Sequence, residues 1–127
     1  MTQVKIALAA LLLGSAAGAE PPAAPDPVVA YPDNYRVLLE NERVRVLDFR
    51  LAKGAREQAH SHPAHVAVFL EEFTIRFTLP DGSQPLREAR PHQVSWSEPT
   101  VHASENIGVS DAHGILVELK PASCPAE

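Results

Sequence analysis

The sequence contains a single cysteine, Cys124, close to its C-terminus. One cysteine cannot form an intramolecular disulfide, so the folded domain must be stable without one. The free thiol either pairs between two chains or lies without further role in a flexible tail, which we expect over residues 121–127. Basic residues are also scarce, with 11 Lys and Arg against 16 Asp and Glu. The chain has no cluster of Lys and Arg of the kind that nucleic acids require, so we expect no nucleic-acid partner.

Long apolar runs are missing as well. The run over residues 6–13 is shorter than the roughly 20 apolar residues that a membrane-spanning helix needs. It follows the positive charge of Lys5 and precedes the small residues 17–19, which is the pattern of a secretory signal peptide over residues 1–19. A short membrane anchor is the alternative, whereas the lack of a cysteine after the small residues argues against a lipoprotein anchor. We therefore expect an exported protein, periplasmic or secreted, with no stable membrane span after processing.

Helical periodicity is a third absence. No stretch after residue 19 repeats apolar residues at helical spacing between capping residues. Residues 20–32 are rich in proline and favour extended polyproline conformation. We expect residues 20–34 to form a semi-rigid N-terminal arm that either acts as a spacer or lies along the folded domain.

Alternation of polar and apolar residues is what the chain has in abundance. Residues 74–79 alternate without a fault, which predicts a half-buried strand, and residues 80–83 form a turn after it. Residues 44–51 predict another strand, with a bulge where the alternation slips between Val46 and Leu47. Further short strands are expected over residues 93–96, 101–107 and 114–119. Many short strands of this kind predict one all-β domain over residues 35–120, an antiparallel sandwich or barrel of which the jelly roll is one form.

Large apolar side chains in these segments are expected to form the core or to line a cavity within it. Packing is the first role of a buried aromatic residue, so we favour the core over specific ligand contact. The residues of this predicted set are Phe49, Phe69, Ile75, Phe77, Val94 and Trp96.

Six histidines follow residue 19, and three of them lie close together at positions 60, 62 and 65. Residues i and i+2 of a strand share a face and lie roughly 6.6 Å apart along it, so the rings of His60 and His62 can converge on one metal ion. Imidazole is a ligand that suits Zn, Cu, Fe and Ni. His-x-His is a weak motif by itself. His92 and His113 have no partner at ligand spacing and are expected to lie at the surface or to form hydrogen bonds.

The residues around this histidine pair form a wider pattern. Gly54 precedes His60 with five residues between them, and His102 precedes Asn106 with three residues between them. In these spacings the chain resembles the cupin family, whose first motif contains Gly, five residues and His-x-His, and whose second motif ends in His, three residues and Asn. The resemblance is strongest to small single-domain cupins, in the segments 41–46, 60–63 and 117–120.

The resemblance implies a fold, a metal and an assembly. The fold is the double-stranded β-helix, a jelly-roll barrel, with a divalent transition metal ion (Zn, Fe, Cu, Ni or Mn) bound inside it by His60, His62 and His102. Asn106 either orients His102 or serves the turn before Gly108. A homodimer is expected, since small cupins often pair and a chain of this size buries only a modest core by itself.

The chain departs from the family in one ligand. The position of the metal-binding Glu of the first motif falls at Val66 or Ala67, and neither of these residues can bind a metal. The remaining ligands are three neutral imidazoles, so a bound ion keeps its full +2 charge. His65 is a candidate fourth ligand. On a regular strand it would face away from the site, but Pro63 can reset the alternation. The alternative is a histidine at the rim that supports a ligand.

Three functions stay open at this stage. The first is a metal-dependent enzyme of oxygenase type, because a three-His site leaves coordination positions free and thiol dioxygenases among the cupins also use three His and no Glu. The second is a non-catalytic module that binds a metal or a small molecule. The third is a barrel without metal. In the first two, the expected partner is a small-molecule substrate or ligand.

Overall fold

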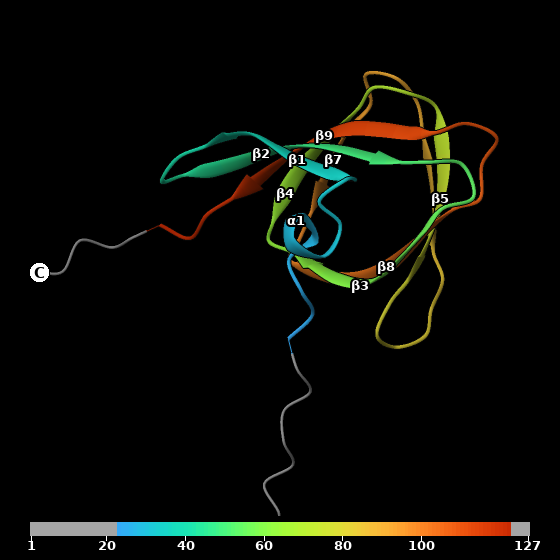
Figure 1. Cartoon of the computed structure of the whole chain (residues 1–127), viewed down its shortest axis with the longest axis horizontal. Helices are drawn as coiled ribbons and strands as arrows, with labels where there is room; N and C mark the ends of the chain where they lie inside the picture. Colours follow the sequence, from blue (N-terminus) through green and yellow to red (C-terminus); the bar gives the residue numbers. More distant parts are fainter. Residues whose placement is uncertain (1–22, 123–127) are drawn as a thin grey trace, which may run out of the picture.

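Antiparallel strands dominate the computed structural model, which describes residues 23–122 (Figure 1). The strands form a five-stranded sheet of order β1-β2-β9-β4-β7 and a four-stranded sheet of order β3-β8-β5-β6. Together the two sheets enclose the interior of a barrel, as the all-β jelly-roll prediction required. The elements are α1 (Pro27–Ala30), β1 (Tyr35–Glu40), β2 (Val44–Leu51), β3 (Arg56–His62), β4 (His65–Phe69), β5 (Phe73–Thr78), β6 (Leu86–Ala89), β7 (Val94–Ser97), β8 (Thr100–Asn106) and β9 (Ala112–Leu119).

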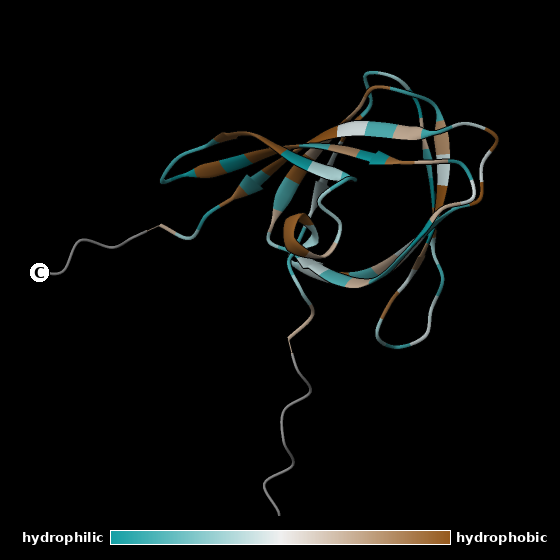
Figure 2. Ribbon diagram, in the orientation of Figure 1, coloured by the Kyte–Doolittle hydropathy of each residue, from teal (hydrophilic) through white to brown (hydrophobic). Residues whose placement is uncertain are grey.

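Alternation along the strands places one face of each sheet inside the barrel. In β9 every second residue from Ala112 to Glu118 is buried, and in β4 the same holds from His65 to Phe69. Figure 2 shows hydrophobic and hydrophilic residues succeeding one another along these strands. The apolar core is formed by Tyr35, Leu47, Phe49, Leu51, Ala67, Phe69, Phe73, Ile75, Ala89, Ala112 and Leu116.

The predicted core is right for four residues and wrong for two. Phe49, Phe69 and Ile75 are buried, and Phe77 packs against them half-buried. Val94 and Trp96 are instead 61% and 51% exposed. They lie on β7, an edge strand that turns its serines inward and its apolar residues outward. Alternation marks the two faces of such a strand, but it does not say which face is the inner one.

The predicted bulge in β2 is also wrong. This strand pairs with β9 without a break from Val44 to Leu51. The irregularity lies in its other neighbour, β1, between Val37 and Leu39. The apparent slip in the sequence arises because β2 carries apolar residues on its outer face at one end and on its inner face at the other.

The N-terminal arm is not extended throughout. Asp26 caps a single helical turn by accepting a hydrogen bond from the Val28 N–H at 2.8 Å, and Pro27 occupies the first turn, where its missing N–H costs nothing. Before this turn the arm lies against β3, since the Ser61 N–H donates to the Pro25 carbonyl at 2.9 Å. The sequence predicts that the arm either acts as a spacer or lies along the folded domain. Its described part does the second.

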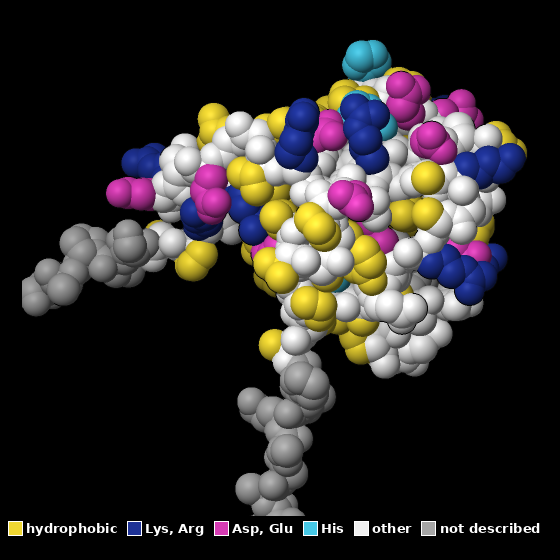
Figure 3. Space-filling model, in the orientation of Figure 1, with side chains coloured by type: hydrophobic (Ala, Val, Ile, Leu, Met, Phe, Trp, Pro, Cys, Tyr) yellow, Lys and Arg dark blue, Asp and Glu magenta, His cyan; other side chains and the backbone are white. Residues whose placement is uncertain are grey.

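On the face shown in Figure 3, hydrophobic side chains gather over α1 and the adjoining arm, while acidic and basic side chains are interspersed around them. Within residues 23–122 no helix is long and apolar enough to cross a membrane. The expected signal peptide and Cys124 lie outside the described residues. The predicted turn over residues 80–83 is present, with Gly82 at φ 84° and the Asp81 carboxylate accepting from the Ser83 N–H at 2.9 Å.

Candidate metal centre

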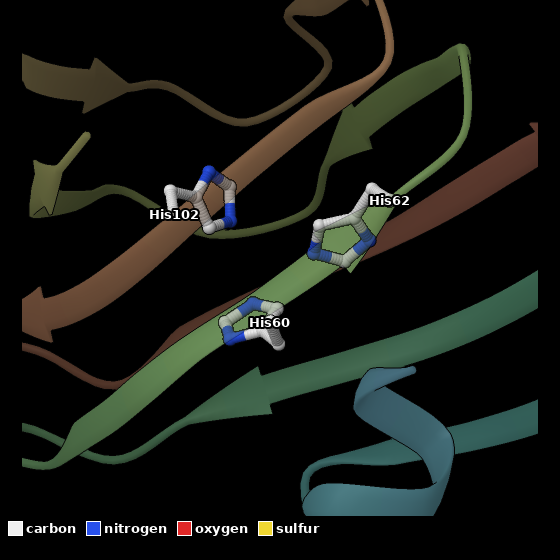
Figure 4. Close-up of side chains that lie close together, drawn as sticks. All are labelled: His60, His62 and His102. Atoms are coloured by element: carbon white, nitrogen blue, oxygen red, sulfur yellow. The ribbon is translucent and has the colours of Figure 1, made fainter. Parts of the chain in front are cut away.

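Three histidines meet inside the barrel where β3 pairs with β8. His60 and His62 lie on the same face of β3, and His102 lies opposite His60 on β8. The ring nitrogens that they offer all lie within 4.8 Å of one another (Figure 4). His60 and His62 are buried, and His102 is nearly so. The sequence prediction that these three residues converge is therefore confirmed, and their arrangement is one that a transition metal ion could occupy.

Hydrogen bonds hold two of the rings. The Nδ1 atom of His60 lies 2.8 Å from the Gln58 carbonyl oxygen, and the Nδ1 atom of His62 lies 3.4 Å from a carboxylate oxygen of Glu118. Both partners are acceptors, so they favour the proton on Nδ1 and leave the lone pair on Nε2. Acceptors of this kind behind a ligating histidine fix its tautomer and ring orientation.

Two of the three histidines, His62 and His102, are held in the neutral form that binds metals. Burial and the nearby rings of His62, His60 and His65 lower the pKa of His102 to about 3. Burial also lowers the pKa of His62, although its hydrogen bond to Glu118 opposes the shift. At neutral pH these two rings thus offer lone pairs rather than positive charges, so a metal ion has no proton to displace from either of them.

Glu118 is a buried carboxylate that the sequence prediction missed. Besides His62, it accepts a hydrogen bond from Arg45 Nε at 2.7 Å, and Arg45 in turn binds Asp26 of the arm at 2.7 Å. Burial alone would raise the Glu118 pKa, but the bonds from His62 and Arg45 lower it, so the group stays ionised. Its sequence signal is an acidic residue at an inward position of β9, in phase with Leu116.

A second buried carboxylate, Glu57, lies on the other side of His60. Its Oε1 atom accepts a hydrogen bond from Asn34 Nδ2 at 2.8 Å, and its Oε2 atom accepts one from the Tyr35 hydroxyl at 3.0 Å. The same Oε2 atom lies 3.6 Å from His60 Nε2. The pairing of β3 with β8 is irregular between Glu57 and His60, so both residues face inward despite their odd spacing. Burial and the Glu57 charge raise the pKa of Tyr35 well above its usual value, so the phenol remains protonated and donates. Sequence analysis missed Glu57 because the irregularity of β3 hides its phase.

His65 also points into the barrel. His62 and His65 are both buried although they are three residues apart, a spacing that would place them on opposite faces of a regular strand. The intervening Pro63–Ala64 step therefore resets the alternation, as expected. The His65 ring centroid lies 5.3 Å from that of His62, and its Nδ1 lies 2.8 Å from the Pro63 carbonyl oxygen. The tight group of nitrogens comprises the other three histidines only. Ligation by His65 therefore stays a prediction.

The remaining polar residues serve the fold. Asn106 donates to the carbonyls of Leu51 and Ser110, each at 2.9 Å, and accepts from the Gly108 N–H, so it serves the turn rather than His102. His113 binds Asp48 at 2.7 Å, and His92 is exposed, as expected for both.

A cavity of about 200 Å³ adjoins the cluster. His62, His65 and His102 line it, and the Phe77 ring stacks on that of His102 with centroids 4.4 Å apart. Most of its remaining wall is apolar, which is typical of a site for a small molecule. The geometry thus places free space beside the ring nitrogens.

The comparisons with known proteins come from structure. No protein-family model matches the sequence, and no curated protein matches it either. A cupin domain from Bordetella pertussis Tohama I is 21% identical over 82% of this chain and 100% of its own, with a TM-score of 0.64. The cupin domain of an XRE family transcriptional regulator from Enterobacter cloacae is 18% identical over 69% of this chain and 96% of its own, with a TM-score of 0.53.

An enzyme is also among the similar structures. A polyketide cyclase from Streptomyces resistomycificus is 17% identical over 67% of this chain and 63% of its own, with a TM-score of 0.52. An enzyme and a domain of a transcriptional regulator thus share this architecture, so the likeness does not indicate an activity. What it shows is that the chain has the small double-stranded β-helix fold of the cupin superfamily.

Proposed function

We propose that this protein binds one divalent transition metal ion through His60, His62 and His102 and presents it to a small molecule in the adjoining cavity. The observation that carries the proposal is the convergence of three buried ring nitrogens within 4.8 Å beside free space. Three protein ligands leave at least one position open on a tetrahedral ion, which is the arrangement of catalytic rather than structural metal sites.

The finer proposal is a metal-dependent enzyme of oxygenase type. When bound, an ion with three neutral ligands keeps its full +2 charge, which supplies a Lewis acid and lowers the pKa of a coordinated water. The residues around it orient the site: Glu118 holds His62 from behind, and Tyr35 with Glu57 packs beside His60. Phe69, Phe73 and Phe77 form an apolar part of the cavity wall.

The competing proposal is a module that holds the ion and a small molecule without turnover. The regulator domain with this fold supports it, because a cupin barrel also occurs as a domain of a transcriptional regulator. The two proposals share the metal site and differ in what the open position does.

Oxygen consumption distinguishes the two. The full chain is purified without an affinity tag, reconstituted with Fe²⁺, and its iron content is measured. Oxygen uptake is then followed with thiols, diketones and phenolics. If the protein is an oxygenase, oxygen uptake depends on both iron and one class of compound. The His102→Ala variant abolishes this uptake. Bound iron with no uptake across the panel favours the module. Failure to bind Fe²⁺, Zn²⁺, Cu²⁺, Ni²⁺ or Mn²⁺ stoichiometrically contradicts both and favours a barrel without metal.

A further inference from the structure

The cavity beside the histidine cluster has one cationic side chain among the described residues that line it, Arg87. Arg87 lies on β6, the edge strand of the four-stranded sheet, directly opposite Ile75 of β5. Ile75 is buried in the core, and residues paired across antiparallel strands share a face, so Arg87 faces the barrel interior. Its guanidinium carbon lies 5.9 Å from the centroid of the buried Phe69 ring.

Among the described residues, no side chain pairs with the charge of Arg87. Within residues 23–122 its guanidinium forms no ion pair and no hydrogen bond, whereas Arg76 on the opposite face of the same sheet pairs with Glu105 at 3.6 Å. A partly buried guanidinium without a counter-ion has lost hydration that its contact with the Phe69 ring replaces only in part. An anionic ligand in the cavity would supply the missing partner, and a carboxylate matches the planar fork of the guanidinium.

The positions of the charged groups give the cavity two different ends. Arg87 is level with Asn106 of β8, because both residues pair with Ile75, and His102 lies four residues from Asn106 along the same strand. The backbone positions of Arg87 and His102 are thus separated by roughly 13 Å along the strand direction and by roughly 10 Å across the sheet, since β5 lies between β6 and β8. Glu57, which also lines the cavity, is next to His60 and contributes negative charge toward the histidine end.

Aromatic side chains line the space between these ends. Phe69 lies under Arg87, Phe77 stacks on His102, and Phe73 packs edge-on against Phe69 with centroids 5.2 Å apart. The volume of about 200 Å³ equals that of roughly seven water molecules, so only a compact ligand fits. An apolar or aromatic body suits this wall, while a second charged group has no partner along it.

We propose that the ligand of this cavity is a small organic monoanion, a carboxylate on an apolar body. Its carboxylate binds Arg87, its body lies along Phe69 and Phe77, and its far end approaches the histidine cluster. In the metal-free protein, the negative charge of Glu57 disfavours the reversed orientation. The approach to a metal ion rests on the proposed function above, but the pairing with Arg87 does not, since it uses the protein's own charge alone.

Benzoate and benzamide test this proposal, because they have nearly the same shape and differ in charge. Isothermal titration calorimetry measures the binding of each to the full chain, both free of metal and loaded with Zn²⁺. We expect both forms to prefer benzoate by on the order of tenfold, as for a charge-assisted bidentate contact. Arg87→Gln removes this preference, whereas Arg76→Gln, a matched loss of positive charge on the outer face, retains it.

Three outcomes overturn the proposal: equal affinity for the two compounds, no measurable benzoate binding at millimolar concentration, or a benzoate preference that persists in a folded Arg87→Gln variant. The last would mean that the anion is selected by the metal or another group. Thermal unfolding of each variant checks its fold. Metal content is measured on the same samples, so a protein that prefers benzoate through Arg87 but binds no metal contradicts the proposed function and leaves this inference intact.

Discussion

Glu118 shows how a residue with no direct place in the histidine cluster can determine its geometry. The carboxylate is 2% exposed and is shared between His62 and Arg45. Since Arg45 also binds Asp26, one chain of polar contacts runs from the N-terminal arm to a predicted metal ligand. A buried carboxylate in this position is stable only while both of its partners remain.

We predict that Glu118→Gln weakens metal binding by about 10- to 100-fold, because a neutral amide accepts the His62 proton less strongly and holds the ring less firmly. Competition with a chromogenic chelator measures the affinity for Zn²⁺. Glu105→Gln is the matched control, since Glu105 lies on β8 but pairs with Arg56 on the outer face at 3.0 Å. Equal affinities in the wild type and the Glu118 variant would contradict the role given to this residue.

Asp48 provides a pH-dependent contribution to stability outside the site. Burial alone would raise its pKa, but hydrogen bonds from His113 and Arg50 lower it below the usual 3.8. A carboxyl group with a depressed pKa stabilises the folded protein above its unfolded pKa, and this contribution is lost as the pH falls through the folded value. We predict that Asp48→Asn costs about 1 kcal/mol at pH 6 and that this cost shrinks as the pH falls through the depressed pKa of Asp48, below 3.8.

Urea unfolding at several pH values between 2.5 and 6 measures this difference in the free energy of unfolding. A gap between wild type and variant that stays constant over the range would show that the carboxylate charge of Asp48 contributes nothing.

At the residue scale, the sequence predicted the histidines and missed their carboxylates. His60 and His62 share a face by simple strand geometry, and the spacing of His102 follows the cupin pattern, so three residues could be placed together. Glu57 and Glu118 carry no motif. Their burial depends on the β3 irregularity and on the pairing of β9 with β2, which are properties of the assembled sheets.

Among the elements, those with an apolar inner face could be read from the sequence most accurately. Residues 44–51 form β2 as predicted, and the strand expected over 74–79 differs from β5 by one residue at each end. β3 has no such signal, because its inner face carries Glu57, His60 and His62 in place of apolar side chains. The element that builds the site is thus the one that hydrophobic alternation describes least well.

Asn106 ties three segments together at the end of β8. Its side chain is buried and makes hydrogen bonds to the backbone of Leu51, Gly108 and Ser110. We predict that Asn106→Ala lowers the free energy of unfolding by about 2–4 kcal/mol, since it leaves buried backbone groups without partners. Chemical denaturation measures the loss.

The same variant tests the assignment of Asn106 to the turn rather than to His102. If Asn106 serves the turn alone, the folded Asn106→Ala variant binds Zn²⁺ with an affinity within about threefold of the wild type. This difference is well below a tenfold change in affinity, which corresponds to about 1.4 kcal/mol. A large loss of affinity in the folded variant would instead mean that Asn106 positions His102.

On the scale of the whole molecule, the outer face of the five-stranded sheet is apolar across every strand. The register aligns one apolar residue from each strand in a continuous row: Leu39, Val46, Val117, Val66 and Trp96. Leu39 is 50% exposed and Trp96 51% exposed at the two ends. An apolar row of this kind on an outer face is typical of a contact surface, and a second copy carries the same row in a self-complementary, two-fold arrangement.

We therefore predict a homodimer through this face. Sedimentation velocity of the full chain at micromolar concentration should give a dimer, and the double variant Leu39→Glu with Trp96→Glu should be a folded monomer, because two buried charges oppose the contact. Val29→Glu changes an exposed apolar residue on α1, outside this row, and should leave the dimer intact. A monomeric wild type, or a dimeric double variant, would exclude this interface.

The central claim is that His60, His62 and His102 form one metal site. The most direct test is equilibrium dialysis of the tag-free full chain against Zn²⁺, followed by elemental analysis of the protein. The account predicts one ion per chain in the wild type and in His92→Ala, an exposed control, and loss of the ion in folded His60→Ala and His102→Ala variants. A wild type without stoichiometric metal, or His60→Ala and His102→Ala variants that each retain a full equivalent, would contradict it.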